Sequence, residues 1–205
     1  MHQPQSEVIL HGDQEPNPTQ YVILAGSGAL VLLLGLLLAA CVPVALSRPV
    51  TKLGLVAPFE GTQRARGYEA LYAAKLALRE QNAAGGASGW QVELVALDQD
   101  DQPELLVRQF HALEADPDVT YVIGLAAAPE TGPLRQQFAA VGLPVEFVDP
   151  SATADPPLDP VFAENYRALS NGAQPGGLAT RVYLAAKSAL VHIAERVRIQ
   201  GRPTR

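Results

Sequence analysis

Residues 52–61 read KLGLVAPFEG, an apolar run that ends abruptly at proline and glycine. A short apolar run bounded by turn residues is typical of a buried β-strand. Apolar residues then recur at helical spacing from about Gln63 to Ala84, and Gly85-Gly86 stops this pattern. The stretch therefore predicts a strand followed by a helix that packs on a sheet.

The same alternation of strand and helix patterns continues along the chain. We predict further strands at 90–97, 119–125 and 143–148, and further helices at 103–115, 130–141 and 177–200. Strands that alternate with helices are typical of βαβ units. We therefore predict an α/β fold with a parallel, doubly wound sheet of about four to five strands and flanking helices. The proline-rich stretch 151–176 is predicted to be a loop, and 177–200 a closing helix.

The first part of the chain has a different character. Residues 21–47 contain no charged residue and are long enough to cross about 30 Å of hydrocarbon. We predict a transmembrane helix or an uncleaved signal anchor there, with a buried core helix as the alternative. Residues 1–20 are acidic and lack apolar periodicity, which predicts a disordered tail. Residues 48–205 remain as a single soluble domain.

Two signals bear on the anchor and disagree about the side of the membrane. Leu38-Ala39-Ala40-Cys41 resembles a lipoprotein cleavage box, so Cys41 is a candidate for lipid attachment, although a lone cysteine in an aliphatic run is also a common small apolar residue. Residues 1–20 contain no Lys or Arg, whereas Arg48 and Lys52 follow the apolar segment. The positive-inside rule would then place the domain in the cytoplasm.

Composition excludes several classes of function. From Arg48 onward the chain has 15 basic and 18 acidic residues, which is not the charge of a nucleic-acid-binding domain. A single cysteine cannot form an internal disulfide or a cysteine-based zinc site. The chain has no complete catalytic motif, so we predict that it is not an enzyme and has neither cofactor nor metal. Asp98, Asp100 and Asp101 could bind a divalent cation, but we favour a solvated turn that leads into a helix N-terminus, which explains the same charges.

Four stretches, in unbroken order, carry a family resemblance. They are KLGLVAPFEG at 52–61, ALREQNAAGGASGWQVELVALDQDDQP at 77–103, DPDVTYVIG at 116–124 and GLPVEFVDPSAT at 142–153. Together they resemble the substrate-binding proteins of branched-chain amino-acid ABC transporters, which have the type I periplasmic-binding fold. The resemblance implies an extracytoplasmic domain in the cell membrane, single-pass or lipid-anchored, in contrast to the positive-inside rule.

The resemblance also implies an unusual domain content. Members of this family have two lobes, and the chain enters the second lobe after about four strands. Here only about two dozen residues separate Thr153 from the helix at 177–200, which resembles a late segment of the family. We therefore expect a single lobe, in a sequence that is cut short relative to the family.

Ligand residues are expected in the loops beyond the carboxyl ends of the strands. The resemblance points to Ser151, Ala152 and Thr153, although the two hydroxyl residues could merely cap a turn. The loop after the third strand has Ala126-Ala127-Ala128-Pro129 where the family has hydroxyl residues. That leaves Thr131, with backbone amides, and Gln63 in the first loop as further candidates.

These observations lead to two hypotheses of function. The first is a membrane-tethered solute-binding lobe that recognises a small polar molecule such as an amino acid. Because one lobe offers only one wall of an enclosure, such binding should be weak or should depend on a partner, either a second copy or a transporter or receptor subunit. The second is a remnant lobe that binds no ligand and acts as a dimerisation or protein-interaction module.

Overall fold

The computed structural model describes residues 48–205 except 101, 155 and 205, and these residues form one compact unit. Its strands are β1 (Val50–Ala57), β2 (Gln91–Asp98), β3 (Val119–Leu125) and β4 (Val145–Val148). Its helices are α2 (Arg64–Ala83), α3 (Pro103–Ala115), α4 (Ala128–Ala140), α5 (Pro160–Leu169) and α6 (Gly177–Gln200). The predicted tail at 1–20, membrane segment at 21–47 and lipid attachment at Cys41 lie outside the described residues.

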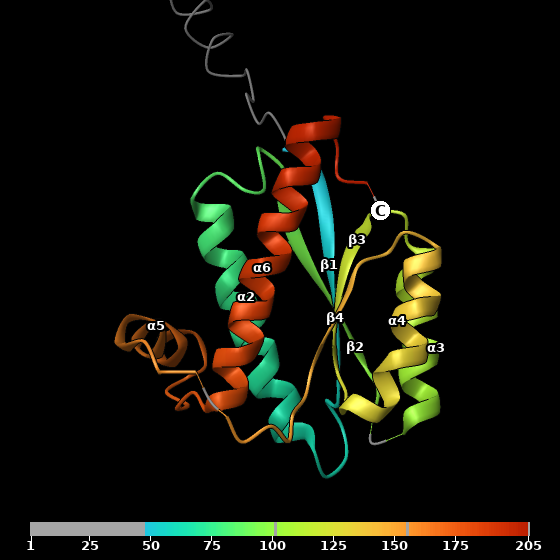
Figure 1. The fold of residues 1–205 in the computed structure, drawn as a ribbon. Coiled ribbons are helices and arrows are strands. Elements are labelled where there is room, and N and C mark those ends of the chain that lie inside the picture. The colour runs from blue at the N-terminus through green and yellow to red at the C-terminus, as the bar shows by residue number, and fades with distance from the viewer. Residues whose placement is uncertain (1–47, 101, 155, 205) are drawn as a thin grey trace, which may run out of the picture. The chain divides into compact units, whose positions relative to one another are not determined.

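All four strands are parallel, in the order β2-β1-β3-β4. Helices cover both faces of the sheet: α2 and α6 lie on one face, and α3 and α4 on the other (Figure 1). The α/β fold with a parallel, doubly wound sheet is confirmed, with four strands. Within the described residues, no helix is apolar over the length that a membrane crossing requires.

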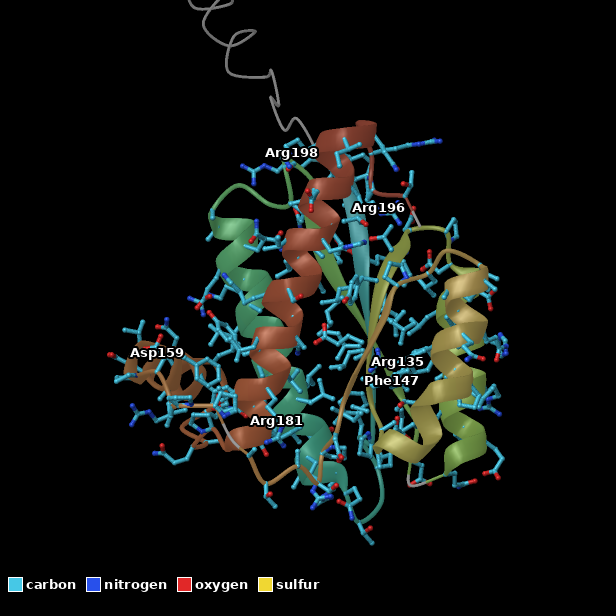
Figure 2. The ribbon with its side chains drawn as sticks, viewed as in Figure 1. Arg135, Phe147, Asp159, Arg181, Arg196 and Arg198 are labelled. Carbon is cyan, nitrogen blue, oxygen red and sulfur yellow. The ribbon has the colours of Figure 1, made fainter. Side chains whose placement is uncertain are left out.

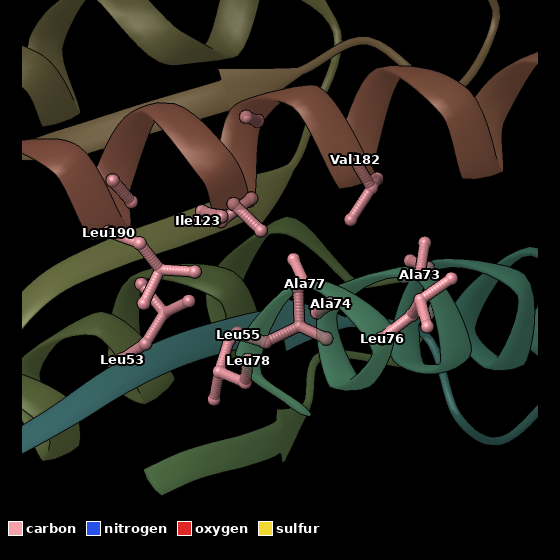
Figure 3. Close-up of a cluster of buried hydrophobic side chains, with 14 of the residues drawn as sticks. Leu53, Leu55, Ala73, Ala74, Leu76, Ala77, Leu78, Ile123, Val182 and Leu190 are labelled. Atoms are coloured by element: carbon pink, nitrogen blue, oxygen red, sulfur yellow. The ribbon is translucent and has the colours of Figure 1, made fainter. Parts of the chain in front are cut away.

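Two apolar cores hold these layers together, one on each face of the sheet. Leu53 and Leu55 of β1 and Ile123 of β3 are fully buried against α2 and α6, where small residues allow close approach (Figure 3). On the other face Phe110 of α3 lies 5.2 Å from the ring of Phe138 of α4, centroid to centroid. Because all the strands are parallel, the loops that follow them meet at one edge of the sheet.

The prediction that 151–176 is a loop is wrong for ten of those residues, because α5 occupies Pro160–Leu169. Asp159 caps this helix: its Oδ1 atom accepts a hydrogen bond from the backbone N–H of Val161 at 2.9 Å. Pro160 suits the first helical turn, where no backbone donor is needed. Phe162 and Tyr166, one turn apart, bury the inner face of α5 against the core that α2 and α6 share.

Candidate ligand site

A cavity of about 220 Å³ lies at the edge of the sheet where the strands end. Residues that follow each of the four strands line it: Pro58, Gln63 and Arg66 after β1; Gln99, Asp100, Gln102 and Leu106 after β2; Leu125, Ala126 and Ala127 at the end of β3; and Pro150 after β4. This is the edge at which parallel α/β sheets bind ligands.

Asp98, the last residue of β2, holds the rim of the cavity in place. Its Oδ1 atom accepts hydrogen bonds from the backbone N–H groups of Phe59 at 2.6 Å, Glu60 at 3.3 Å and Asp100 at 3.1 Å. One carboxylate oxygen thus fixes the loop after β1 and the turn after β2. Asp98 is therefore engaged in the scaffold, and the described residues contain no cluster of His, Cys, Asp or Glu that could hold a metal.

Gln99 connects the second loop to the third. Its Nε2 atom donates to the carbonyl oxygen of Leu125 at 2.9 Å, and its backbone N–H donates to Ala57 at 3.2 Å. Its Oε1 atom is buried and has no hydrogen-bond partner among the described residues. A buried acceptor without a partner is energetically costly. A hydrogen-bond donor supplied by a small conformational change or by a ligand would therefore stabilise this oxygen.

The charged residues of the cavity are Arg66, which belongs to α2, and Asp100, which lies in the loop after β2. Arg66 lies on the first turn of α2, three residues after Gln63 and therefore on the same helix face. Asp100 has a φ of 48°, a left-handed conformation that aspartate tolerates better than most residues. Its Oδ2 atom accepts from Nε2 of Gln102 at 3.3 Å. One cation and one anion that line the same cavity suit a ligand that carries both charges.

The structure brings only one of the predicted ligand residues to this cavity. Gln63 lines it, whereas Ala152 and Thr153 are exposed outside it. Thr131 is buried within α4 and is not among the lining residues. The loop after β3 contributes Ala126 and Ala127, so hydroxyl groups are absent from the wall that this loop forms.

Ser151 forms a local turn with Asp149. The serine Oγ donates to Oδ1 of Asp149 at 2.6 Å, and its backbone N–H donates to the same atom at 2.8 Å. These two hydrogen bonds, with a smaller contribution from the positive charge of Arg181, hold the pKa of Asp149 below its usual value. Nη2 of Arg181, at the start of α6, also donates to the carbonyl of Asp149 at 3.3 Å (Figure 2). The contacts of Ser151 are therefore those of a residue that caps a turn.

Sequence reasoning missed Arg66, Gln99, Asp100 and Gln102 as candidate ligand residues. A signal for the last three was present: they directly follow the second strand, at the same sheet edge as the loops that were considered. In the sequence, Asp98, Asp100 and Asp101 instead suggested a metal site or a solvated turn before a helix. Arg66 could have been found from its spacing of three residues from Gln63.

Comparison with known proteins identifies the family of the chain. A family model described as periplasmic binding protein matches residues 50–194. The chain belongs to this family. No curated protein matches it significantly.

Solved structures of substrate-binding proteins are also similar to the chain. The branched-chain amino-acid transporter substrate-binding protein LivJ from Streptococcus pneumoniae, solved with isoleucine, is 28% identical with a TM-score of 0.43, over 48% of this chain and 28% of that one. A type 1 periplasmic binding protein from Bordetella pertussis is 26% identical with a TM-score of 0.43, over 47% of this chain and 26% of that one. The chain thus spans well under half the length of these two family members.

Proposed function

We propose that this chain is a membrane-tethered, extracytoplasmic solute-binding lobe that takes a small polar molecule, such as an amino acid, at the cavity between its four strand-end loops. The observation that carries the proposal is that Arg66, from the first turn of α2, and Asp100, from the loop after β2, both line that cavity. Arg66 would pair with a carboxylate and Asp100 with an ammonium group. Membership of the periplasmic binding protein family supports this use of the sheet edge.

The size of the cavity argues for weak or partner-dependent binding. Its volume of about 220 Å³ is below the range of roughly 300–1,000 Å³ in which ligand pockets enclose a small molecule. A ligand on these loops would keep much of its surface in water. A second chain, either another copy or a transporter or receptor subunit, would supply the opposite wall.

Ligand-dependent stabilisation tests this proposal. The full chain in detergent is heated with a panel of amino acids and small amides at millimolar concentration, and its melting temperature is recorded. Binding at a dissociation constant one hundredth of the ligand concentration would add about 2.7 kcal/mol to the unfolding free energy. If no compound of the panel changes the melting temperature of the parent chain or of the Arg66→Gln variant, the result would count against a binding site in this cavity.

The sidedness of the domain needs its own experiment. In a Cys41→Ala background a cysteine replaces Ser188, which is exposed on α6, and an impermeant thiol reagent is added to intact cells. Labelling before lysis is the expected result for an extracytoplasmic domain. Labelling only after lysis would reject this location.

A dimerisation module is the second candidate function, and the outer face of α6 favours it. Leu184 and Val191 lie seven residues apart on this helix, with 50% and 64% of their surfaces exposed. Two helical turns place them on one stripe. If this stripe dimerises the chain, Leu184→Gln with Val191→Gln converts dimer to monomer in sedimentation measurements. A monomeric parent at high micromolar concentration would remove this candidate.

A further inference from the structure

We propose that the open edge of β4 is a docking site for an acidic, extended segment of another protein, which binds there as an added strand. β4 stands last in the order β2-β1-β3-β4, and within the described residues only β3 pairs with it. It lies between α6 and α4 (Figure 1). Val145 and Phe147 of this edge do not line the ligand cavity, so the docking role does not depend on the proposed function.

The backbone of β4 alternates between β3 and the open side. The carbonyl oxygens of Pro144 and Val148 accept hydrogen bonds at 3.0 and 3.2 Å from N–H groups of β3 and of the residue that follows it. Successive residues of a strand direct their backbone groups to opposite sides. The backbone N–H and carbonyl groups of Val145 and Phe147 therefore point to the open side, where an added strand could pair with them.

Arginine side chains reach this open side at both ends of the strand. Nη1 of Arg135, on α4, donates to the carbonyl of Val145 at 3.4 Å, and its guanidinium lies 5.1 Å from the ring centre of Phe147. Arg181, on α6, donates to the carbonyl of Asp149 at 3.3 Å (Figure 2). These contacts leave the N–H groups of Val145 and Phe147 and the carbonyl of Phe147 for a further strand.

A groove of about 400 Å³ at the start of β4 indicates the charge of the partner. The start of β4, α4 and α6 line it, and its charged lining residues are Arg135 and Arg196. In the part of the chain that the structure describes, neither guanidinium forms an ion pair with a carboxylate. Two such cations attract an acidic partner, and they repel a second copy of the same edge.

The carboxylates of β4 and of the residue after it are engaged within the domain. Glu146 accepts a hydrogen bond from the hydroxyl of Tyr121 at 3.3 Å. Asp149 accepts two hydrogen bonds within its own turn, and Arg181 donates to its carbonyl oxygen. The groove at the start of the strand therefore keeps its positive charge.

The alternation of side chains in an added strand determines the sequence that would suit this edge. Arg135 comes from α4 and Arg196 from α6, and these helices cover opposite faces of the sheet. Two consecutive acidic residues of the partner could therefore reach one arginine each. β-Branched residues next to them would pack against the half-buried ring of Phe147.

Peptide binding to the full chain in an uncharged detergent tests this proposal. The probes are labelled peptides with the sequence Thr-Glu-Glu-Val-Thr-Val and its reverse, which suit a parallel and an antiparallel strand. We expect one of them to bind in fluorescence anisotropy and to slow amide hydrogen exchange at Val145 and Phe147. Replacement of both glutamates of the probe by lysine should abolish binding. The pair Arg135→Gln and Arg196→Gln should weaken binding about fivefold or more.

The pair Arg64→Gln and Arg79→Gln is the matched control, because it removes the same charge from exposed positions on α2 and should leave binding unchanged. A probe with N-methylated central amides should not bind, since it cannot pair along a strand. Absence of binding by both probes, or binding that N-methylation does not weaken, overturns the proposal. A dimer of the chain alone that Val145→Pro converts to monomer in sedimentation would assign the edge to a second copy and would also overturn it.

Discussion

The carboxylate of Glu69 on α2 accepts a hydrogen bond from the backbone N–H of Ala179 in the first turn of α6, at 2.9 Å. The same Oε1 atom accepts from the N–H of Gly176 at 3.0 Å. Gly176, the N-cap residue of α6, has no side chain that could cap the helix itself. The start of the last helix is therefore capped by a carboxylate that belongs to the first helix of the domain, and its negative charge complements the positive end of the helix dipole.

We predict that Glu69→Ala destabilises the domain by about 1–2 kcal/mol, because it leaves two backbone donors of α6 without their acceptor. Glu69→Gln should cost less, since an amide oxygen can still accept one of these bonds. The measurement is urea unfolding followed by circular dichroism. Glu164→Ala, an exposed glutamate of α5, is the control, and an equal loss of stability in both alanine variants would refute the capping role.

Two glycines within helices should respond to alanine to different extents. A Cβ atom at Gly67 of α2 would lie 1.8 Å from the carbonyl oxygen of Pro58, whereas at Gly132 of α4 it would meet nothing within 4 Å. We expect Gly67→Ala to destabilise by roughly 1–3 kcal/mol. Gly132→Ala should change stability by less than about 1 kcal/mol, since the better helix propensity of alanine is opposed by contact between its Cβ and the ring of the following Pro133. Thermal unfolding of both variants checks the prediction, and a Gly67→Ala chain as stable as the parent would contradict the close packing.

The two charges of the cavity should both matter for any amino acid that stabilises the chain. Arg66→Gln and Asp100→Asn should each weaken binding by about tenfold or more, since a hydrogen bond to a charged group contributes roughly 1.5–3 kcal/mol. Asparagine tolerates the positive φ at position 100 and so preserves the loop. Calorimetric titration measures the effect. Arg64→Gln, two residues from Arg66 but outside the cavity, is the control, and the same loss in this variant would indicate a nonspecific charge effect.

His192 of α6 should make stability fall as the solution becomes acidic. Burial, and secondarily the charge of Arg196, hold the pKa of His192 below the ordinary value of 6.5. The unfolded chain therefore binds the proton more readily, and stability is fully present above pH 6.5 and declines as the pH falls toward the lower pKa of the folded state. Melting temperatures between pH 8 and pH 5 test this. His192→Gln should reduce the slope in this window, and an unchanged slope would remove His192 as its source.

The elements with a single dominant pattern were the ones that the sequence predicted well. β3 was predicted at 119–125 and is observed at Val119–Leu125, and α6 was predicted at 177–200 and is observed there. β3 is a nearly continuous apolar run that is buried on both faces, and α6 has apolar residues at helical spacing along its buried face, so burial matches each pattern. The helix α5 was missed because its prolines suggested a loop, whereas Pro160 begins the helix and Asp159 caps it.

The candidate site was less predictable than the fold. Gln63 was chosen for its position beyond the end of a parallel strand, and it lines the cavity because topology brings these loops together. Ser151 and Thr153 were selected for their hydroxyl groups, yet the Ser151 hydroxyl is hydrogen-bonded to Asp149 and Thr153 is exposed outside the cavity. Which loop residues point inward depends on turns such as the one that Asp98 holds, and those hydrogen bonds join residues nearly forty positions apart.

Helix α6 follows all four strands in the chain, and this order affects folding during synthesis on the ribosome. With α2, this helix covers the side of the sheet on which Leu55 and Ile123 lie, and among the described elements it is translated after the whole sheet. In a nascent chain that has emerged only as far as α5, the apolar surface that α6 later covers is exposed to solvent. Translational pausing there would lengthen the interval in which neighbouring nascent chains can aggregate or a chaperone can engage.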